Sequence, residues 1–169
     1  MRKILISACL FGEQVRYDGK HSLINHPIIA RWKAEGRLVK ICPECAGGLP
    51  TPRSPSEIQS KFPILITSQD AQDVTPEFLT GAEKTLELAK QEHVCCALMK
   101  ARSPSCGNTQ IYDGSFSGKL VADSGIAASE LLRNGIPVFN EHQLEDMFRF
   151  IEARQSTSVF SETQTGKSA

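Results

Sequence analysis

The stretch KILISAC, residues 3–9, decides the fold because it is a short apolar run that ends in a cysteine. A run of this length followed by turn residues predicts a buried β-strand. Two later runs follow the same plan. Residues 38–41 lead directly into Cys42, and residues 94–99 precede a loop that contains Cys106. The sequence therefore predicts three strands that each end beside a cysteine.

Helical patterns separate these strands. The expected helices lie between Asn25 and Gly36, from Thr75 onward, from Ser124 to Asn134 and from Asn140 onward, with a fourth short strand at residues 137–139 and a small hairpin or irregular loop at residues 110–120. Strands that alternate with helices predict an α/β fold, in which a mostly parallel open sheet carries helices on both faces, as in Rossmann and flavodoxin-like proteins. Such sheets bind ligands beyond the carboxyl ends of their strands.

Length and charge narrow the class of protein. The chain has 169 residues, which fits a single domain, and we expect that domain over residues 1–153 and a disordered tail over residues 154–169. Lys plus Arg equals Asp plus Glu at 19 each, so no excess charge indicates a nucleic acid or an anionic membrane as partner. No apolar run approaches the ~20 residues that span a bilayer, and the N-terminus lacks the pattern of a signal peptide, so we expect a cytoplasmic protein.

Six cysteines need an explanation in a reducing compartment, where a disulfide framework is not expected. If the strands are parallel, Cys9, Cys42 and Cys106 emerge at one edge of the sheet and converge in space. Cys95 and Cys96 lie inside a predicted strand, and we expect them to be core residues, because free cysteine is among the most buried residue types.

The spacing of the cysteines leaves several kinds of site open. Cys42 and Cys45 form a C-x-x-C motif, but the glycines and prolines that follow do not suit the long helix of a thioredoxin-like site. A structural zinc site would need a second pair of ligands at suitable spacing. Iron–sulfur clusters take cysteine thiolates, which suits Cys9, Cys42 and Cys106. A cluster, a zinc site, thiol chemistry and no site at all therefore stay possible on spacing alone.

Several residues near the cysteines are candidates for binding a substrate. Arg16 and Arg53 carry guanidinium groups that can hold an anionic group. Ser105 lies in the tight loop Ser103–Gly107, whose amides and hydroxyls can donate hydrogen bonds. Asp18 lies in an Arg-Tyr-Asp-Gly turn, where it can cap the turn.

Taken together, these segments resemble the thiouracil desulfidase (TudS) family. The resemblance runs in the same order through almost the whole chain, on the segments Ser7-Ala8-Cys9-Leu10, Arg16-Tyr17-Asp18-Gly19, Cys42-Pro43-Glu44, Gly47–Arg53, Arg102–Gly107 and Tyr112-Asp113-Gly114. Each motif alone is weak, whereas the ordered set is specific.

The resemblance implies a [4Fe–4S] cluster that is held by three cysteines, which correspond here to Cys9, Cys42 and Cys106. It also implies that one iron has no protein ligand and binds the sulfur of the substrate. For catalytic groups it implies a glutamate and a serine near the cluster, which correspond here to Glu44 as the base and to Ser103. Asp18 is a further candidate for activating the water. The family pattern does not require a cysteine at the position of Cys45, so Cys45 is either spare or a substitute ligand when the cluster is damaged.

The implied reaction is hydrolytic removal of sulfur from a thiolated pyrimidine: 2-thiouracil, 4-thiouracil or a thiolated uridine monophosphate. The carbonyl product has the oxidation level of the thione, so no net electron transfer is needed. Two alternatives remain. A non-catalytic zinc module could use Cys42 and Cys45, and a sulfur-inserting enzyme could act on tRNA, although the chain has no glycine-rich phosphate loop and no net positive charge.

Overall fold

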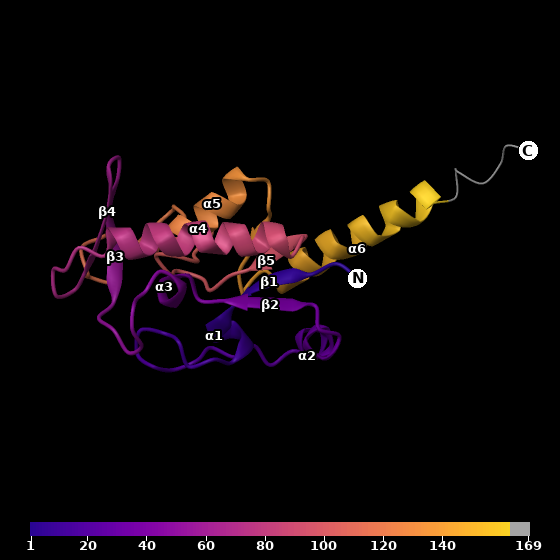
Figure 1. Cartoon of the computed structure of the whole chain (residues 1–169), viewed down its shortest axis with the longest axis horizontal. Coiled ribbons are helices and arrows are strands. Elements are labelled where there is room, and N and C mark those ends of the chain that lie inside the picture. The colour runs from indigo at the N-terminus through magenta and orange to yellow at the C-terminus, as the bar shows by residue number, and fades with distance from the viewer. Residues whose placement is uncertain (163–169) are drawn as a thin grey trace, which may run out of the picture.

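Four parallel strands form the centre of the protein in a computed structural model (Figure 1). They are β1 (Ile4–Ser7), β2 (Leu38–Ile41), β5 (Cys96–Leu98) and β8 (Val138–Phe139), in the order β2-β1-β5-β8. All three neighbouring pairs are parallel. The structure describes residues 1–162, and for residues 156–162 it describes the backbone alone.

Helices cover both faces of this sheet, which confirms the predicted fold class (Figure 1). One face packs against α4 (Thr75–Gln91) and α5 (Ile126–Arg133), and the other against α1 (Ala8–Phe11), α2 (Pro27–Ala34) and α6 (Leu144–Glu162). The side chains of β1 alternate accordingly. Leu5 belongs to the core beside α4, and Ile4 and Ile6 belong to the core beside α2 and α6.

The strand order creates a switch point between β1 and β5. The chain passes from β1 to β2 on one side and later returns to β5 on the other side of β1. At such a point the connections leave in opposite directions, so a crevice opens beyond the carboxyl ends of the two strands. Cys9 follows β1, and Cys106 lies in the loop that follows β5.

A short helix, α3 (Pro43–Ala46), lies directly on α4 at this edge. A Cβ atom at Gly47 would lie 1.9 Å from the carbonyl oxygen of Glu77, and one at Gly81 would lie 2.0 Å from the carbonyl oxygen of Pro43. Glycine inside a helix costs about 0.5–1 kcal/mol relative to alanine. Packing therefore explains the glycine at position 81, because the missing Cβ atom lets the backbone of α3 lie directly against α4.

Two hairpins extend the same edge of the sheet. One consists of β3 (Ser56–Lys61) and β4 (Ile64–Ser68), and the other of β6 (Ile111–Tyr112) and β7 (Leu120–Val121). The buried carboxylate of Glu57 joins them, because its Oε1 accepts hydrogen bonds from the amides of Gly114 (3.0 Å) and Phe116 (3.2 Å).

Local structure differs from the sequence-based expectation at several points. Residues 8–11 form one helical turn, where we expected the end of a strand. The N-cap of α2 is His26, one residue after the expected start at Asn25, because the Nδ1 of His26 accepts from the amide of Ile28 at 3.2 Å. The C-x-x-C motif opens only the single turn α3, in line with the expectation that no long helix follows it. The hairpin β3–β4 was not expected, and residues 110–120 take the hairpin form.

The last helix, α6, extends to Glu162 and so enters the segment 154–169 that we expected to be a disordered tail. Residues 163–169 of this predicted tail lie outside the described residues. Within the described part of the chain, no helix combines the length and the apolar character that crossing a membrane requires.

Candidate functional site

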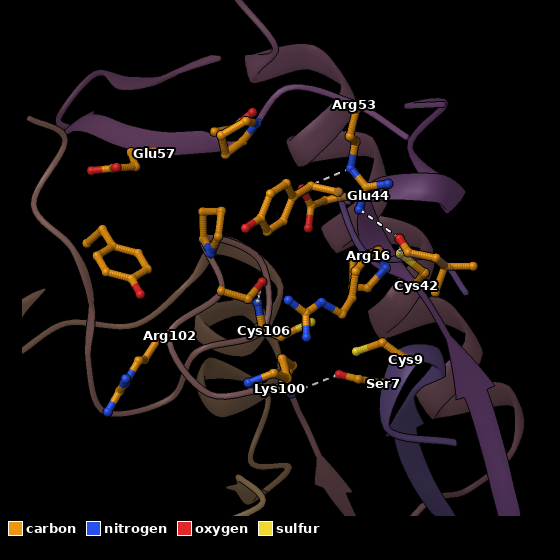
Figure 2. Close-up of a pocket in the computed structure, with 18 of the residues that line it drawn as sticks. Ser7, Cys9, Arg16, Cys42, Glu44, Arg53, Glu57, Lys100, Arg102 and Cys106 are labelled. Atoms are coloured by element: carbon orange, nitrogen blue, oxygen red, sulfur yellow. Dashed lines mark hydrogen bonds and ion pairs between the residues drawn. The ribbon is translucent and has the colours of Figure 1, made fainter. Parts of the chain in front are cut away.

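A cavity of about 470 Å³ opens beyond the carboxyl ends of β1, β2 and β5. Its lining comes from every segment that the sequence singled out, and it includes Cys9, Arg16, Cys42, Glu44, Arg53 and Ser103 together with Cys106 (Figure 2). The two hairpins close its far side with Glu57, Tyr112 and Phe116. The cavity thus lies where a parallel sheet of this order places a ligand.

Three cysteines lie together in this cavity, as the strand topology predicts. Cys9 is in α1, Cys42 is the N-cap of α3, and Cys106 is in the loop after β5. Cys9 and Cys106 are 8% and 5% exposed. Residues that are 97 positions apart in the chain are therefore neighbours in space, and no local motif brings them together.

The three thiols share a buried environment, and burial raises the pKa of each of them. Burial raises the pKa of Cys9 to about 11 and that of Cys42 to about 12. Burial also raises the pKa of Cys106, and the nearby Cys9 and Cys42 raise it further, against a lowering contribution from the hydroxyl of Ser7. These shifts favour the neutral thiols, and a bound metal centre would favour their thiolate forms.

The loop that carries Cys106 is fixed by hydrogen bonds. The Oγ of Ser103 accepts from the amides of Ser105 and Cys106, both at 3.1 Å. The first amides of α5 are satisfied by the same loop, because Gly125 donates to Gly107 (2.7 Å) and Ile126 donates to Pro104 (2.9 Å). The position of Cys106 is therefore set by the start of a helix as well as by its own loop.

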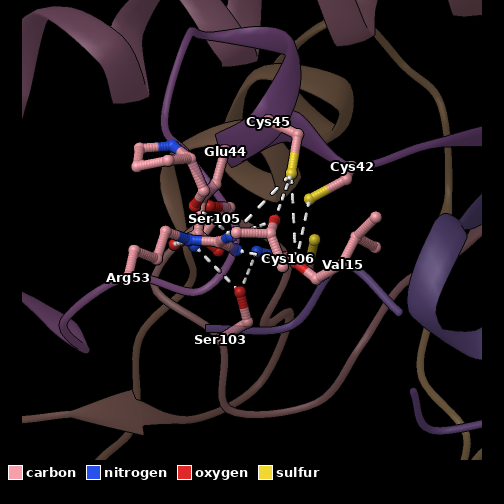
Figure 3. Close-up of polar contacts among 10 residues, drawn as sticks. Val15, Cys42, Glu44, Cys45, Arg53, Ser103, Ser105 and Cys106 are labelled. Carbon is pink, nitrogen blue, oxygen red and sulfur yellow. Dashed lines mark hydrogen bonds and ion pairs between the residues drawn. The ribbon is translucent and has the colours of Figure 1, made fainter. Parts of the chain in front are cut away.

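Glu44 faces the cavity from the first turn of α3, and Arg53 lies beside it (Figure 3). The Nε of Arg53 lies 3.4 Å from the carboxylate Oε1 of Glu44. The guanidinium group also donates to the carbonyls of Val15 (3.0 Å) and Pro50 (3.1 Å). Its side chain is only 6% exposed. Arg53 thus uses most of its donors within the protein and orients Glu44.

The other predicted residues lie at different distances from the cavity. Arg16 lines it and pairs with Asp18 at 3.0 Å, while its second terminal nitrogen donates to Ser22 at 2.8 Å. Asp18 accepts from the amide of Lys20 and does not line the cavity. Ser105 is buried outside the lining, and its Oγ has no hydrogen-bond partner among the described residues. Neither Asp18 nor Ser105 belongs to the cavity lining, and the roles expected for them in catalysis and substrate binding stay predictions.

The three remaining cysteines are not in the cavity lining. Cys45 lies next to Cys42, with its Sγ 3.4 Å from the Oγ1 of Thr51 and 3.7 Å from Arg53 (Figure 3). Cys95 and Cys96 lie at the opposite edge of the sheet, where their sulfurs are 3.8 Å apart. Cys96 is fully buried in the core, as expected, and Cys95 packs partly against it.

Sequence reasoning missed several polar residues at the cavity, among them Ser7, Glu57 and Lys100 in the lining and, next to the lining, Glu141, which pairs with Lys100. Ser7 and Lys100 follow the rule that located the cysteines, because each lies at the carboxyl end of a central strand. The amide of Lys100 donates to the Oγ of Ser7 at 3.0 Å. The other two residues carry no signal of this kind. Glu57 lies in the unexpected hairpin, and Glu141 reaches Lys100 from after β8.

The donor set fits an iron–sulfur cluster better than a single ion. Thiolates are the usual ligands of such clusters, and three thiols line one end of the cavity. Within the described residues, no group of three or more Cys, His, Asp or Glu side chains is close enough together to hold one metal ion. A four-iron cluster is a larger body than an ion, so its protein ligands stand further apart.

Comparisons with known proteins agree with this chemistry. The model of the 2-thiouracil desulfurase family matches residues 4–143. The protein YbbK of Bacillus subtilis (strain 168), whose function is uncharacterized, is 38% identical over 151 residues, which cover 85% of this chain and 99% of YbbK. A solved structure described as the [4Fe–4S]-dependent thiouracil desulfidase TudS is 42% identical, with a TM-score of 0.87 over 90% of this chain and 99% of TudS.

Proposed function

The chain belongs to the 2-thiouracil desulfurase family, and on this basis we propose that it is a [4Fe–4S]-dependent desulfidase that hydrolyses a thiolated pyrimidine to the carbonyl compound and hydrosulfide. The observation that carries the proposal is the convergence of three cysteines and Glu44 on one cavity. The match to a desulfidase that uses this cofactor supports the assignment.

We assign the cluster to the thiols of Cys9, Cys42 and Cys106. Three protein ligands leave one iron available, and when bound the cluster would supply a Lewis acid with affinity for the soft sulfur of a thiocarbonyl group. Cys45 has hydrogen-bonding partners outside the cavity, and this supports its exclusion from the set. Free thiols and a cluster of this type suit the reducing cytoplasm.

Glu44 is the general base in this proposal. Its carboxylate takes a proton from a water molecule, and the water oxygen bonds to the ring carbon that carries sulfur. As this bond forms, the second electron pair of the carbon–sulfur double bond moves to sulfur. The remaining carbon–sulfur bond then breaks, the proton held by Glu44 passes to sulfur, and sulfur leaves with the bonding electrons as hydrosulfide, while the hydroxyl on carbon loses its proton to solvent and becomes the carbonyl. Carbon keeps its oxidation level, so the step needs no oxidant or reductant. Arg53 fixes the direction of the carboxylate, and its bonds to Val15 and Pro50 keep it in place.

The substrate class follows from the charges of the cavity. Four cations line it, and Arg16, Arg53 and Lys100 each pair with a carboxylate. Arg102 has no such partner among the described residues, and it lies on the opposite side of the cavity from Cys9 and Cys42 (Figure 2). A nucleotide carries its phosphate at a distance from the base. This arrangement favours a thiolated uridine monophosphate over free 2-thiouracil or 4-thiouracil.

The experiment is anaerobic reconstitution with iron and sulfide, followed by measurement of hydrosulfide release from 2-thiouracil, 4-thiouracil and 4-thiouridine monophosphate. We expect iron with acid-labile sulfide, release from at least one of the three compounds, and the highest kcat/KM for the nucleotide. Arg102→Ala should lower kcat/KM for the nucleotide about tenfold and leave that for the free bases unchanged, since one charged hydrogen bond contributes about 1.5–3 kcal/mol.

Three results would contradict the proposal in different ways. Zinc without acid-labile sulfide would indicate a zinc module, and a loaded cluster without hydrosulfide release would exclude the desulfidase reaction. If Arg102→Ala lowers kcat/KM equally for the nucleotide and the free bases, the proposed contact between Arg102 and the phosphate is excluded, whereas the desulfidase assignment is not affected.

A further inference from the structure

Lys100 occupies a central place that the reaction described above does not use. It follows Met99 at the carboxyl end of β5, beside the switch point, and its side chain lines the cavity. It lies next to Ser7 and Cys9, whereas Glu44 and Arg53 lie on another wall (Figure 2). Lys100 is thus the cation that the sheet places at the cysteines.

Hydrogen bonds to Ser7 and Glu141 hold Lys100 in this place. Its amide donates to the Oγ of Ser7 at 3.0 Å, and its Nζ lies 2.5 Å from the Oε1 of Glu141. The second carboxylate oxygen of Glu141 accepts from the amide of Ala101 at 2.8 Å. Glu141 therefore binds the side chain of Lys100 and the next backbone amide together. The side chains of Lys100 and Glu141 are 28% and 16% exposed, so solvent screens this pair only in part.

The position of Lys100 relates it to the cysteines. Its side chain lines the cavity together with Cys9 and Cys106, and both cysteines lie near it in Figure 2. The other cations near the cysteines are directed to other acceptors, because Arg16 binds Asp18 and Ser22, and Arg53 binds Glu44 and main-chain carbonyls. Lys100 is therefore the cation of the lining that lies on the side of Cys9 and Ser7, whereas Arg53 lies on the side of Cys42 and Glu44 (Figure 2).

We propose that Lys100, held by Glu141, is the counter-cation of the three cysteines and a further catalytic residue, whose ammonium group offsets the negative charge of the thiolate-bound cluster and of the departing sulfur. Three thiolates on a [4Fe–4S] core give a net negative charge, and sulfur that leaves the substrate adds to it. A fixed cation in a partly dehydrated cavity stabilises such developing charge without reorganisation. The catalytic part rests on the proposed desulfidase function, and the electrostatic part requires only the cluster.

The two members of the pair predict opposite effects on the cluster. Reduction adds an electron, so removal of the Lys100 charge should disfavour it and shift the midpoint potential to more negative values. Removal of the negative charge of Glu141 should leave the lysine uncompensated and shift the potential to more positive values. A role limited to loop stability does not predict this reversal of sign.

The experiment is a redox titration of the anaerobically reconstituted protein, followed by electron paramagnetic resonance. The variants are Lys100→Met, Lys100→Arg and Glu141→Gln. Lys3→Met is the matched control, because Lys3 pairs with Glu92 at the amino edge of the same sheet. We expect a more negative potential for Lys100→Met, a more positive one for Glu141→Gln, and parental values for Lys100→Arg and Lys3→Met. Hydrosulfide release should fall at least about tenfold in Lys100→Met and stay near parental in Lys100→Arg.

A parental potential in Lys100→Met, or shifts of the same sign in Lys100→Met and Glu141→Gln, would overturn the proposal. If Lys100→Met takes up no iron, the Glu141→Gln shift decides, because this variant keeps the lysine and the size of its partner. The shifts can be measured in a protein that releases no hydrosulfide. Failure of the desulfidase assignment is therefore distinguishable from failure of the charge assignment.

Discussion

The two edges of the central sheet carry similar residues and differ in what those residues can do. The carboxyl edge has three cysteines and the pair Lys100–Glu141, and the amino edge has Cys95, Cys96 and the pair Lys3–Glu92. At the carboxyl edge the thiols come from separate elements and face one cavity. At the amino edge they are sequence neighbours, and the cavity there has no cysteine in its lining.

This difference shows that topology, and not residue type, makes the site. Connections that leave parallel strands at a switch point diverge, and they leave a crevice that side chains from several loops can line. At the amino edge the ladder between β1 and β5 continues, because the amide of Cys95 donates to the carbonyl of Lys3 at 2.9 Å.

The largest expected effect is loss of the cluster. Changing Cys9, Cys42 or Cys106 to Ala should each abolish the iron-containing brown form, because a cluster with two protein thiolates is poorly held. Iron and acid-labile sulfide are measured after anaerobic reconstitution.

Matched changes at the other cysteines complete this comparison. Cys95→Ala and Cys45→Ala should retain parental iron content, since neither side chain lines the cavity. Loss of the cluster in Cys45→Ala combined with its retention in Cys106→Ala would show that the ligand set is wrong.

The second expected effect is a lower kcat in a protein that still contains the full cluster. Glu44→Gln keeps the shape of the side chain and a hydrogen-bond acceptor for Arg53, but it removes the base. Loss of a general base costs about 10²–10⁴-fold in rate. We expect parental iron content and a kcat reduced at least about a hundredfold. Asp18→Asn, outside the cavity, is the control and should stay near the parental rate. Near-parental turnover by Glu44→Gln would show that a group other than Glu44 takes the proton from the water molecule.

The third expected effect is a loss of stability from a Gly→Ala change inside a helix. Gly→Ala in a helix normally stabilises by about 0.5–1 kcal/mol. At Gly81 the added Cβ would lie 2.0 Å from the carbonyl of Pro43 in α3, so Gly81→Ala should lower the free energy of unfolding by about 1–3 kcal/mol. It should also reduce iron uptake, because α3 carries Cys42 and Glu44. Glu83→Ala, an exposed change in α4, is the control in thermal unfolding. A higher Tm in Gly81→Ala would contradict the close contact.

Much of the carboxyl edge could be predicted from the sequence. The apolar runs before Cys9 and Cys42 are strands, and parallel pairing alone requires that the cysteines after them converge. Periodicity also located α4, since its 17 residues carry a clear apolar stripe. Residues 8–11 were not recognised as helical because four residues are too few to show a helical period.

Long-range polar contacts were beyond the reach of the sequence. β3 has the sequence SEIQSK, in which a single apolar residue gives no alternating pattern, so the wall that carries Glu57 was missed. The partner of Lys100 is 41 positions away, and a Lys–Glu pair has no recognisable spacing. Asp18 and Ser105 were selected because they are polar residues in predicted turns, but whether such a side chain lines the cavity depends on contacts that the sequence does not contain.

The smallest expected effect concerns thiol reactivity at the two edges of the cluster-free protein. The thiol of Cys96 lies 3.8 Å from the sulfur of Cys95, and hydrogen bonding from it is the main cause that lowers the pKa of Cys95 to about 6; the positive charge of Arg2 acts in the same direction. Burial raises the pKa of Cys9 and of Cys42 to about 11 and about 12. The thiolate is the reactive form, so at pH 7 Cys95 is largely ionised while Cys9 and Cys42 are protonated.

Iodoacetamide at pH 7 should therefore modify Cys95 before Cys9 and Cys42, as peptide mass spectrometry can measure. Because the pKa of Cys95 is lowered, its labelling should fall as the pH drops through about 6 and should change little between pH 7 and 9. Labelling of Cys9 and Cys42 should rise throughout that upper range, since their pKa values lie above it. Cys96→Ala removes the donor, so it should shift the labelling curve of Cys95 to higher pH, whereas Lys3→Met should leave the curve in place. Faster labelling of Cys42 than of Cys95 at pH 7 would show that the two edges do not differ in the way their burial and hydrogen bonds indicate.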